Sequence, residues 1–269
     1  MKNCFKCCYT RKRRSDSGGE DSPYFGSNGS VDNMSMISVT YGLESFNKNA
    51  LLLFCQVTGE QGSRNRYLTM KAVAMLKETF QKYRFEVDCH IDLTSTEVQE
   101  KCDEFFSRDF SEYGAVVVVI LAADGKPGML SASDQMFHET VILKHFTTDV
   151  PLTLRGKPKI YITEANRMKT LSDDEIDDHR GGGASAPIKD CYEDILGLHI
   201  PSVIEDEVRS PLHIFCERMN ASEDQGNMIG IMIGSVEEIE ETFPDLTQKL
   251  ELVCTFLKRC TLPMFVLIE

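Results

Sequence analysis

The sequence predicts an α/β fold in which a mostly parallel sheet is covered by helices on both faces. Two continuous apolar runs of strand length, Ala50–Gln56 and Ala115–Ala123, are typical of strands that are buried on both sides. Between such runs, apolar residues recur every three or four positions, which is the spacing of one helical face. This alternation favours parallel pairing through right-handed crossovers.

The first part of the chain is expected to contain four strands and three helices. Thr94 and Glu97 form a capping-box signature, because the hydroxyl can accept from the amide of Glu97 while the carboxylate reaches back. The other two expected strands are Phe85–Ile91 and Pro158–Thr163. The expected helices carry the apolar series Val73, Leu76, Phe80, Tyr83; then Val98, Cys102, Phe105; then Phe137, Val141, Leu143.

Residues 169–193 divide the chain. They hold five acidic residues followed by Gly181, Gly182 and Gly183, so we expect an exposed linker. Structure is expected to resume at Ile195, and a strand at Leu262–Ile268 is expected to end the chain. Two helices are expected between them, marked by Leu212, Phe215, Cys216, Met219 and by Leu246, Leu250, Val253, Leu257.

The composition of the chain disfavours several classes of protein. The net charge of −13 disfavours nucleic-acid binding by the body of the chain, because nucleic-acid binders usually present a basic surface. Residues 1–14 are the exception, with six basic residues and no acid. No apolar run approaches the roughly 18 residues that span a bilayer, and no secretory signal is visible. The ten cysteines show no disulfide framework, so reduced thiols and a cytoplasmic location are expected.

Several ordered blocks resemble the caspase family of cysteine proteases. The main block is the stretch RGKPKIYITEANR, residues 155–167, and the match extends over residues 41–269. The resemblance implies a three-layer sandwich with a central six-stranded sheet. It also implies a large-subunit-like part (41–168) and a small-subunit-like part (194–269). Residues 1–40 are expected to form a disordered leader because they are poor in large apolar residues and rich in Ser, Gly and Asn. The other blocks are Leu76–Phe80, Asp92–Thr94, Val116–Gly128 and Phe243–Leu246.

The resemblance also implies that the catalytic chemistry is missing. Asn166 occupies the position of the family's nucleophilic cysteine, and Asp124 occupies that of its histidine. A carboxamide is not deprotonated at neutral pH, and a carboxylate cannot replace an imidazole that ionises the thiol and then protonates the leaving amine. We therefore expect a protein that is not an enzyme.

The pocket that binds the substrate's aspartate is altered in the same comparison. Arg66 matches one of the family's two pocket arginines, but Glu164 replaces a glutamine and would repel a carboxylate. Pro201-Ser-Val203 stands where the family has the second arginine. Asp-specific peptide binding is therefore expected to be lost.

Other candidate groups have plainer interpretations. His138 and His145 are interpreted as surface imidazoles and Cys191 as an incidental thiol. The leader's Cys4, Cys7 and Cys8 are candidates for lipidation, which would anchor the protein to membranes together with the basic residues; the alternatives are an inert basic tail or one that holds a nuclear signal. A zinc site there would lack a fourth ligand, so no metal or cofactor is expected.

Two further features bear on regulation. Asp177 ends a D-E-I-D sequence in the linker, which is either a cleavage site for an active caspase or a solvated acidic loop. In the family, the last strand pairs with its twofold mate, so an apolar terminal strand is expected to form a dimer; the alternative is a strand covered by the protein's own helices. The residues of this dimer strand are Leu262, Met264, Phe265 and Leu267.

These features together predict an inactive caspase homologue that regulates apoptosis. It would bind an active caspase or its zymogen through the terminal strand and block auto-activation. A homodimer is the alternative assembly. The alternative functions are an activating partner in a caspase heterodimer and a residual cysteine endopeptidase. A membrane-tethered scaffold that uses the leader's cysteines is a third class.

Overall fold

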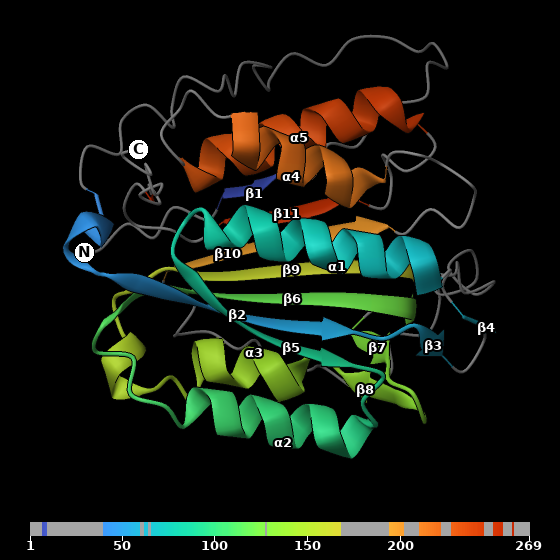
Figure 1. Ribbon diagram of the computed structural model, residues 1–269, viewed down its shortest axis with the longest axis horizontal. Helices are drawn as coiled ribbons and strands as arrows, with labels where there is room; N and C mark the ends of the chain where they lie inside the picture. The colour runs from blue at the N-terminus through green and yellow to red at the C-terminus, as the bar shows by residue number, and fades with distance from the viewer. Residues whose placement is uncertain are drawn as a thin grey trace, which may run out of the picture.

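A sheet with the strand order β1-β11-β10-β9-β6-β2-β5 forms the centre of the protein (Figure 1). The structure is a computed structural model that describes residues 7–9, 40–59, 62–63, 66–126, 128–167, 194–201, 210–221, 227–244, 250–254 and 260. The five strands from β10 to β5 are parallel, and β11 is antiparallel to β10. The predicted α/β fold with a mostly parallel six-stranded sheet is confirmed, and β1 lies beyond β11. The strands are β1 (Cys7–Tyr9), β2 (Lys48–Cys55), β5 (Phe85–Ile91), β6 (Tyr113–Lys126), β9 (Lys159–Arg167), β10 (Ile195–Pro201) and β11 (Glu251–Cys254).

Helices cover both faces of this sheet, as Figure 1 shows. Helices α1 (Arg66–Gln81), α4 (Pro211–Ala221) and α5 (Met228–Thr242) lie on one face, and α2 (Ser95–Phe106) and α3 (Thr140–Thr147) on the other. Phe137, which the sequence assigns to the third helix, lies instead in β8. The short elements are η2 (Leu43–Ser45), β3 (Thr58–Gly59), β4 (Gly62–Ser63), β7 (Met129–Ser131), β8 (Met136–His138) and η3 (Leu152–Leu154).

The central strand β2 is apolar throughout because both of its faces are covered. Leu51 and Leu53 pack in the cluster that includes α1, whereas Leu52 and Phe54 pack in the cluster that includes α2. All four are fully buried. Burying a side chain of this size stabilises the fold by about 2–3 kcal/mol, so an alternating polar pattern would be costly here.

Helix α2 begins at the predicted capping box. The Glu97 amide donates to Thr94 Oγ1 at 3.3 Å, and the Thr94 amide donates to the Glu97 carboxylate at 2.8 Å. The hydrogen bonds from Thr94 lower the pKa of Glu97 below its usual value. This prediction needed only local sequence, because a capping box is completed within four residues.

The prediction of a helix through Leu246, Leu250, Val253 and Leu257 is wrong over residues 251–254, which form strand β11. Along β11, exposed Glu251 and Val253 alternate with half-buried Leu252 and Cys254. This two-residue period overrides the helical spacing because the edge of β10 supplies backbone hydrogen-bond partners along β11.

Sequence reasoning missed helix α5. Its buried residues Met228, Ile231, Met232, Ser235 and Ile239 do have helical spacing. The signal was obscured because the segment also contains two glycines, which disfavour a helix. The segment is helical because α5 packs on α4 and against the core.

Near the ends of the chain, one prediction differs from the structure and several others concern residues that the structure does not describe. The sequence predicts a disordered leader over residues 1–40, but Cys7–Tyr9 form strand β1 and pair with β11. The linker with Asp177 and Cys191, the terminal strand with Leu262, Met264, Phe265 and Leu267, and Cys4 lie outside the described residues.

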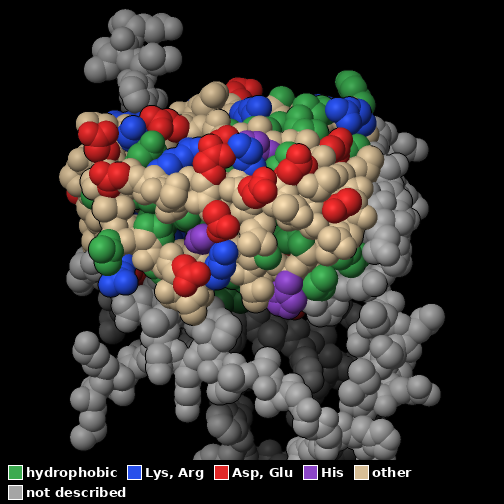
Figure 2. All heavy atoms as spheres, turned by 90° about the horizontal axis from the view of Figure 1, so that it is seen from below, with side chains coloured by type: hydrophobic (Ala, Val, Ile, Leu, Met, Phe, Trp, Pro, Cys, Tyr) green, Lys and Arg blue, Asp and Glu red, His purple; other side chains and the backbone are tan. Residues whose placement is uncertain are grey.

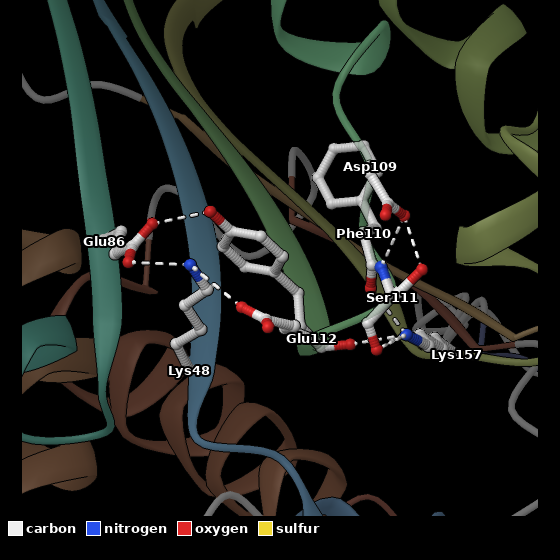
Figure 3. Close-up of polar contacts among 8 residues, drawn as sticks. Lys48, Glu86, Asp109, Phe110, Ser111, Glu112 and Lys157 are labelled. Carbon is white, nitrogen blue, oxygen red and sulfur yellow. Dashed lines mark hydrogen bonds and ion pairs between the residues drawn. The ribbon is translucent and has the colours of Figure 1, made fainter.

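At the amino end of the sheet, Lys157 holds the loop that leads from α2 into β6 (Figure 3). Its Nζ donates to the carbonyl oxygens of Phe110 and Tyr113, both at 2.7 Å, and of Ser111 at 3.3 Å. It also lies 4.5 Å from the centre of the Phe46 ring. Three backbone acceptors thus share one ammonium group, which fixes where β6 begins.

Helices α2 and α3 are joined through His145. Its ring stacks on Phe106 with centroids 4.6 Å apart, and its Nε2 lies 3.0 Å from Asp103 Oδ1. Burial, helped by Lys144, lowers the pKa of His145. The expectation of a surface imidazole therefore fails for His145, which is buried, while His138 is exposed.

The face seen in Figure 2 mixes acidic and basic side chains over its visible surface.

We predict that Lys157→Met destabilises the protein by about 1–3 kcal/mol, because it leaves the part-buried carbonyl oxygens of Phe110 and Tyr113 without their donor. Equilibrium urea unfolding measures the change. Lys71→Met is the matched control, since Lys71 lies exposed on α1. Equal effects of the two substitutions would contradict the role assigned to Lys157.

We also predict that His145 makes the protein less stable as the pH falls through about 6.5. Its folded pKa is below its unfolded value, so the unfolded chain binds more protons in this window and stability rises with pH. His145→Gln should flatten the dependence of Tm on pH between about 7 and 5.5. His138→Gln, at an exposed position, serves as the control and should leave the slope unchanged; an unchanged slope in His145→Gln would refute the assignment.

Candidate functional site

The candidate site lies at the carboxyl ends of the parallel strands, where open α/β sheets usually bind ligands. There the structure brings together two of the residues selected from the sequence. Asp124 of β6 and Asn166 of β9 are direct partners in the register of these neighbouring strands. Strands in a sheet are about 4.8 Å apart, so groups at these two positions belong to one site.

A β-bulge just before Asp124 sets this register. Leu121 pairs with Glu164, and the next pair is Asp124 with Asn166. Strand β6 therefore advances three residues while β9 advances two. Bulges are common next to active sites, because one extra residue bends the strand and changes the direction of the side chains beyond it. Directly after the bulge, β7 folds back antiparallel on the end of β6, with Gly125 opposite Leu130.

Arg66 stands at the start of α1 and forms an ion pair with Asp92, at 3.0 Å between Nη1 and Oδ2. Asp92 follows β5 in a left-handed backbone conformation, and its other oxygen accepts from the amides of Val57 and Thr58. The Arg66 side chain is 65% exposed. Such a pair contributes at most about 1 kcal/mol, so Arg66 is held only weakly in this position.

Glu164 is buried in the sheet, with only 2% of its surface exposed. Its neighbours in register are Leu121 of β6 and Ile200 of β10. Burial, and to a lesser extent the charge of Glu164, raise the pKa of Cys216 in α4 to about 12. Glu164 thus places a carboxylate two residues before Asn166.

Four described cysteines, Cys89, Cys102, Cys216 and Cys260, have a pKa raised by burial, so none of these four is prepared for nucleophilic attack. Burial raises the pKa of Cys89, that of Cys102 to about 12, and that of Cys260 further still. The thiolate is the reactive form, and burial disfavours it. Cys89, Cys102, Cys216 and Cys260 are free cysteines.

The two imidazoles selected from the sequence, those of His138 and His145, have positions distinct from Asn166. His145 lies between α2 and α3, where it contacts Asp103 and Phe106. His138 lies in β8, where its Nδ1 is 2.9 Å from Thr140 Oγ1. Its register partner is Met129, which in turn pairs with Lys126 of β6. His138 therefore lies two strands beyond β6.

Sequence reasoning missed two residues of this region. Asp92 holds both Arg66 and the turn after β2. Gln56 follows β2 and is fully buried, and within the described residues its side-chain nitrogen and oxygen have no hydrogen-bond partner. The backbone amide of Gln56 donates to the Leu121 carbonyl oxygen at 2.7 Å, next to the bulge. A polar residue that ends a buried strand is the signal that could have identified Gln56.

Two other kinds of site are not found in the described part of the chain. Over the residues that the structure describes, no group of three or more His, Cys, Asp or Glu side chains could hold a metal ion. None of the described helices is both long and apolar enough to cross a bilayer.

Comparisons with known proteins agree with this geometry. Caspase-3 of Mesocricetus auratus is 33% identical over 98 residues, which are 36% of this chain and 35% of that protein. Caspase-3 of Mus musculus is 30% identical over 110 residues, 41% of this chain and 39% of that protein. The chain thus aligns with little more than a third of the length of these curated relatives.

Solved structures extend the similarity of fold. The crystal structure of caspase-1 from Spodoptera frugiperda has a TM-score of 0.67 at 18% identity, and the alignment covers 86% of this chain and 96% of that chain. The structure of pro-sf-caspase-1 has the same TM-score and coverage at 17% identity. The family described as Caspase domain matches residues 48–247, which are more than half of the chain. The chain therefore belongs to the caspase family.

Proposed function

We propose that this protein is a catalytically inactive caspase homologue, which regulates cell death by binding an active caspase or its zymogen and blocking auto-activation. One observation carries the proposal. Asp124 and Asn166 are register partners at the carboxyl ends of β6 and β9. The family resemblance assigns the histidine and the cysteine of the active enzymes to these two positions.

The chemistry of these two residues supports the loss of peptidase activity. Acyl transfer needs a thiolate and an imidazole within hydrogen-bond reach. An amide supplies no nucleophile, and a carboxylate ionised at neutral pH supplies no proton to a leaving amine. Cys102 and Cys216 are poor replacements, because burial raises the pKa of each to about 12.

The surroundings support a loss of aspartate recognition as well. Glu164 brings a negative charge to the position where the family holds the substrate's carboxylate. Arg66, the matching arginine, is already engaged by Asp92. The Asp92 carboxylate therefore competes with a substrate carboxylate for Arg66. A protein with this site is better suited to binding other proteins than to binding Asp-containing peptides.

The retained framework supports a role in binding. The parallel strands, the bulge and both helical layers are present in this chain. An inactive chain can regulate an active caspase by taking the place of one subunit in its dimer. This role needs only such a framework and a strand edge at which a related chain can pair. In this proposal the terminal strand with Phe265 pairs with the partner, and the mixed dimer lacks one working site.

The test is co-purification of the full chain with active caspases and zymogens, followed by timed zymogen processing. We expect binding and slowed processing. Phe265→Arg should abolish both, whereas Leu152→Arg, at a side chain that is 76% exposed in η3, should abolish neither. Failure to bind any caspase would refute the proposal. Accelerated processing would refute inhibition and support the activating heterodimer instead.

A further inference from the structure

Strand β5 is the last strand on its side of the sheet, and its outer edge is unpaired among the residues that the structure describes (Figure 1). Two backbone hydrogen bonds fix which of its groups face β2. The Asn49 amide donates to the Arg84 carbonyl oxygen at 2.8 Å, and the Asp92 amide donates to the Cys55 carbonyl oxygen at 2.9 Å. Successive residues of a strand turn their backbone groups to opposite edges, so every second residue of β5 presents its amide and carbonyl outward. These residues are Phe85, Val87, Cys89 and Ile91.

The side chains of β5 do not protect this edge. Natural edge strands often carry lysine, proline or a bulge, each of which discourages pairing with another chain. Strand β5 has the sequence FEVDCHI, which contains neither lysine nor proline, and its register with β2 is regular. Its two acidic side chains are compensated within the chain. Glu86 contacts Lys48 and Tyr113, as Figure 3 shows for Lys48. Asp88 contacts Arg108.

The two faces of β5 carry different rows of side chains. Val87, Cys89 and Ile91 are half-buried and pack against the apolar cluster that includes α1. Asp88 and His90 belong to the other face, where His90 Nε2 lies 3.0 Å from Asp88 Oδ1. A strand added at this edge therefore has to extend an apolar row on one face. On the other face it has to complement a carboxylate that alternates with an imidazole.

A second copy of β5, running antiparallel, meets both requirements. When Cys89 lies opposite the same residue of the second copy, Val87 lies opposite Ile91. In the same register each Asp88 lies opposite a His90. Complementary pairs across strands stabilise a sheet, whereas like charges directly opposite one another destabilise it. The neighbouring register, with Asp88 on the twofold axis, sets two carboxylates opposite each other and is therefore disfavoured.

We propose that the outer edge of β5 is a dimer interface, at which two copies of this chain join their sheets antiparallel around Cys89. The outward backbone groups of Val87, Cys89 and Ile91 then pair across the interface. Phe85 stays unpaired, because it lies opposite Leu93, beyond the end of the strand. The interface uses none of the residues of the terminal strand, so the inference does not rest on the proposed function.

The first test is sedimentation velocity of the full chain carrying Phe265→Arg, over a dilution series, so that the terminal strand does not contribute to association. We expect a reversible dimer that is lost when Val87→Pro is added. Proline is tolerated where the amide of an edge strand faces outward, but it cannot donate to a second copy. Leu152→Pro is the matched control and should leave the dimer intact. Leu152 is exposed at the first position of η3, where proline is also tolerated.

Amide hydrogen exchange of the same protein reports which backbone groups pair. At concentrations at which the dimer forms, the amides of Val87, Cys89 and Ile91 should be protected. Dilution, or the Val87→Pro substitution, should remove the protection of Cys89 and Ile91. The amides of Asp88 and His90 face β2 and are the internal control, since they should stay protected in the monomer and in the dimer.

Four results would overturn the proposal. They are a monomer at every concentration of Phe265→Arg, a dimer that Val87→Pro leaves intact, equal loss of the dimer in Leu152→Pro, and protection of the Phe85 amide, which indicates the other register. Circular dichroism of both proline variants confirms that they remain folded, so that a lost dimer reports on the edge. Failure of the full chain to bind caspases changes none of these readings, so the two proposals fail separately.

Discussion

The pairing of β6 with β9 is the constraint on which the candidate site depends. The two strands lie in the middle of the sheet, and both helical layers pack against their buried apolar residues. One extra residue after Leu121 then brings Asp124 opposite Asn166. Every chemical argument about the site depends on this register, because a shift of one residue would separate the two positions.

The proposed function requires a caspase fold to persist without its reacting pair, and the same framework explains how it does so. Fold stability comes from the apolar clusters and from contacts such as those of Lys157, at the opposite end of the sheet from Asn166. Asp124 and Asn166 stand beyond the bulge, at the carboxyl ends of β6 and β9. Selection on binding can therefore maintain the sheet while the residues at its carboxyl edge change.

The sequence predicted the elements whose signals are local or repeated. Fully apolar strands such as β2 and the capping box of α2 need no knowledge of distant residues. It failed at β11 and α5, because neighbouring elements decide those segments: β10 supplies partners to β11, and α4 packs on α5. The positions of Asp124 and Asn166 came from the family resemblance, whereas Asp92 and Gln56 emerged only once the strand ends were placed in space. Burial of His145 likewise required the packing of α2 on α3.

The most direct measurement is the pH dependence of alkylation at position 166 in Asn166→Cys/Asp124→His, compared with Asn166→Cys/Asp124→Asn. The account predicts that the imidazole lowers the thiol pKa by about one unit or more, because a neighbouring imidazolium stabilises the thiolate. It also predicts that the unsubstituted protein hydrolyses no Asp-containing peptide. Identical profiles for the two variants, or turnover by the unsubstituted protein, would contradict the central claim.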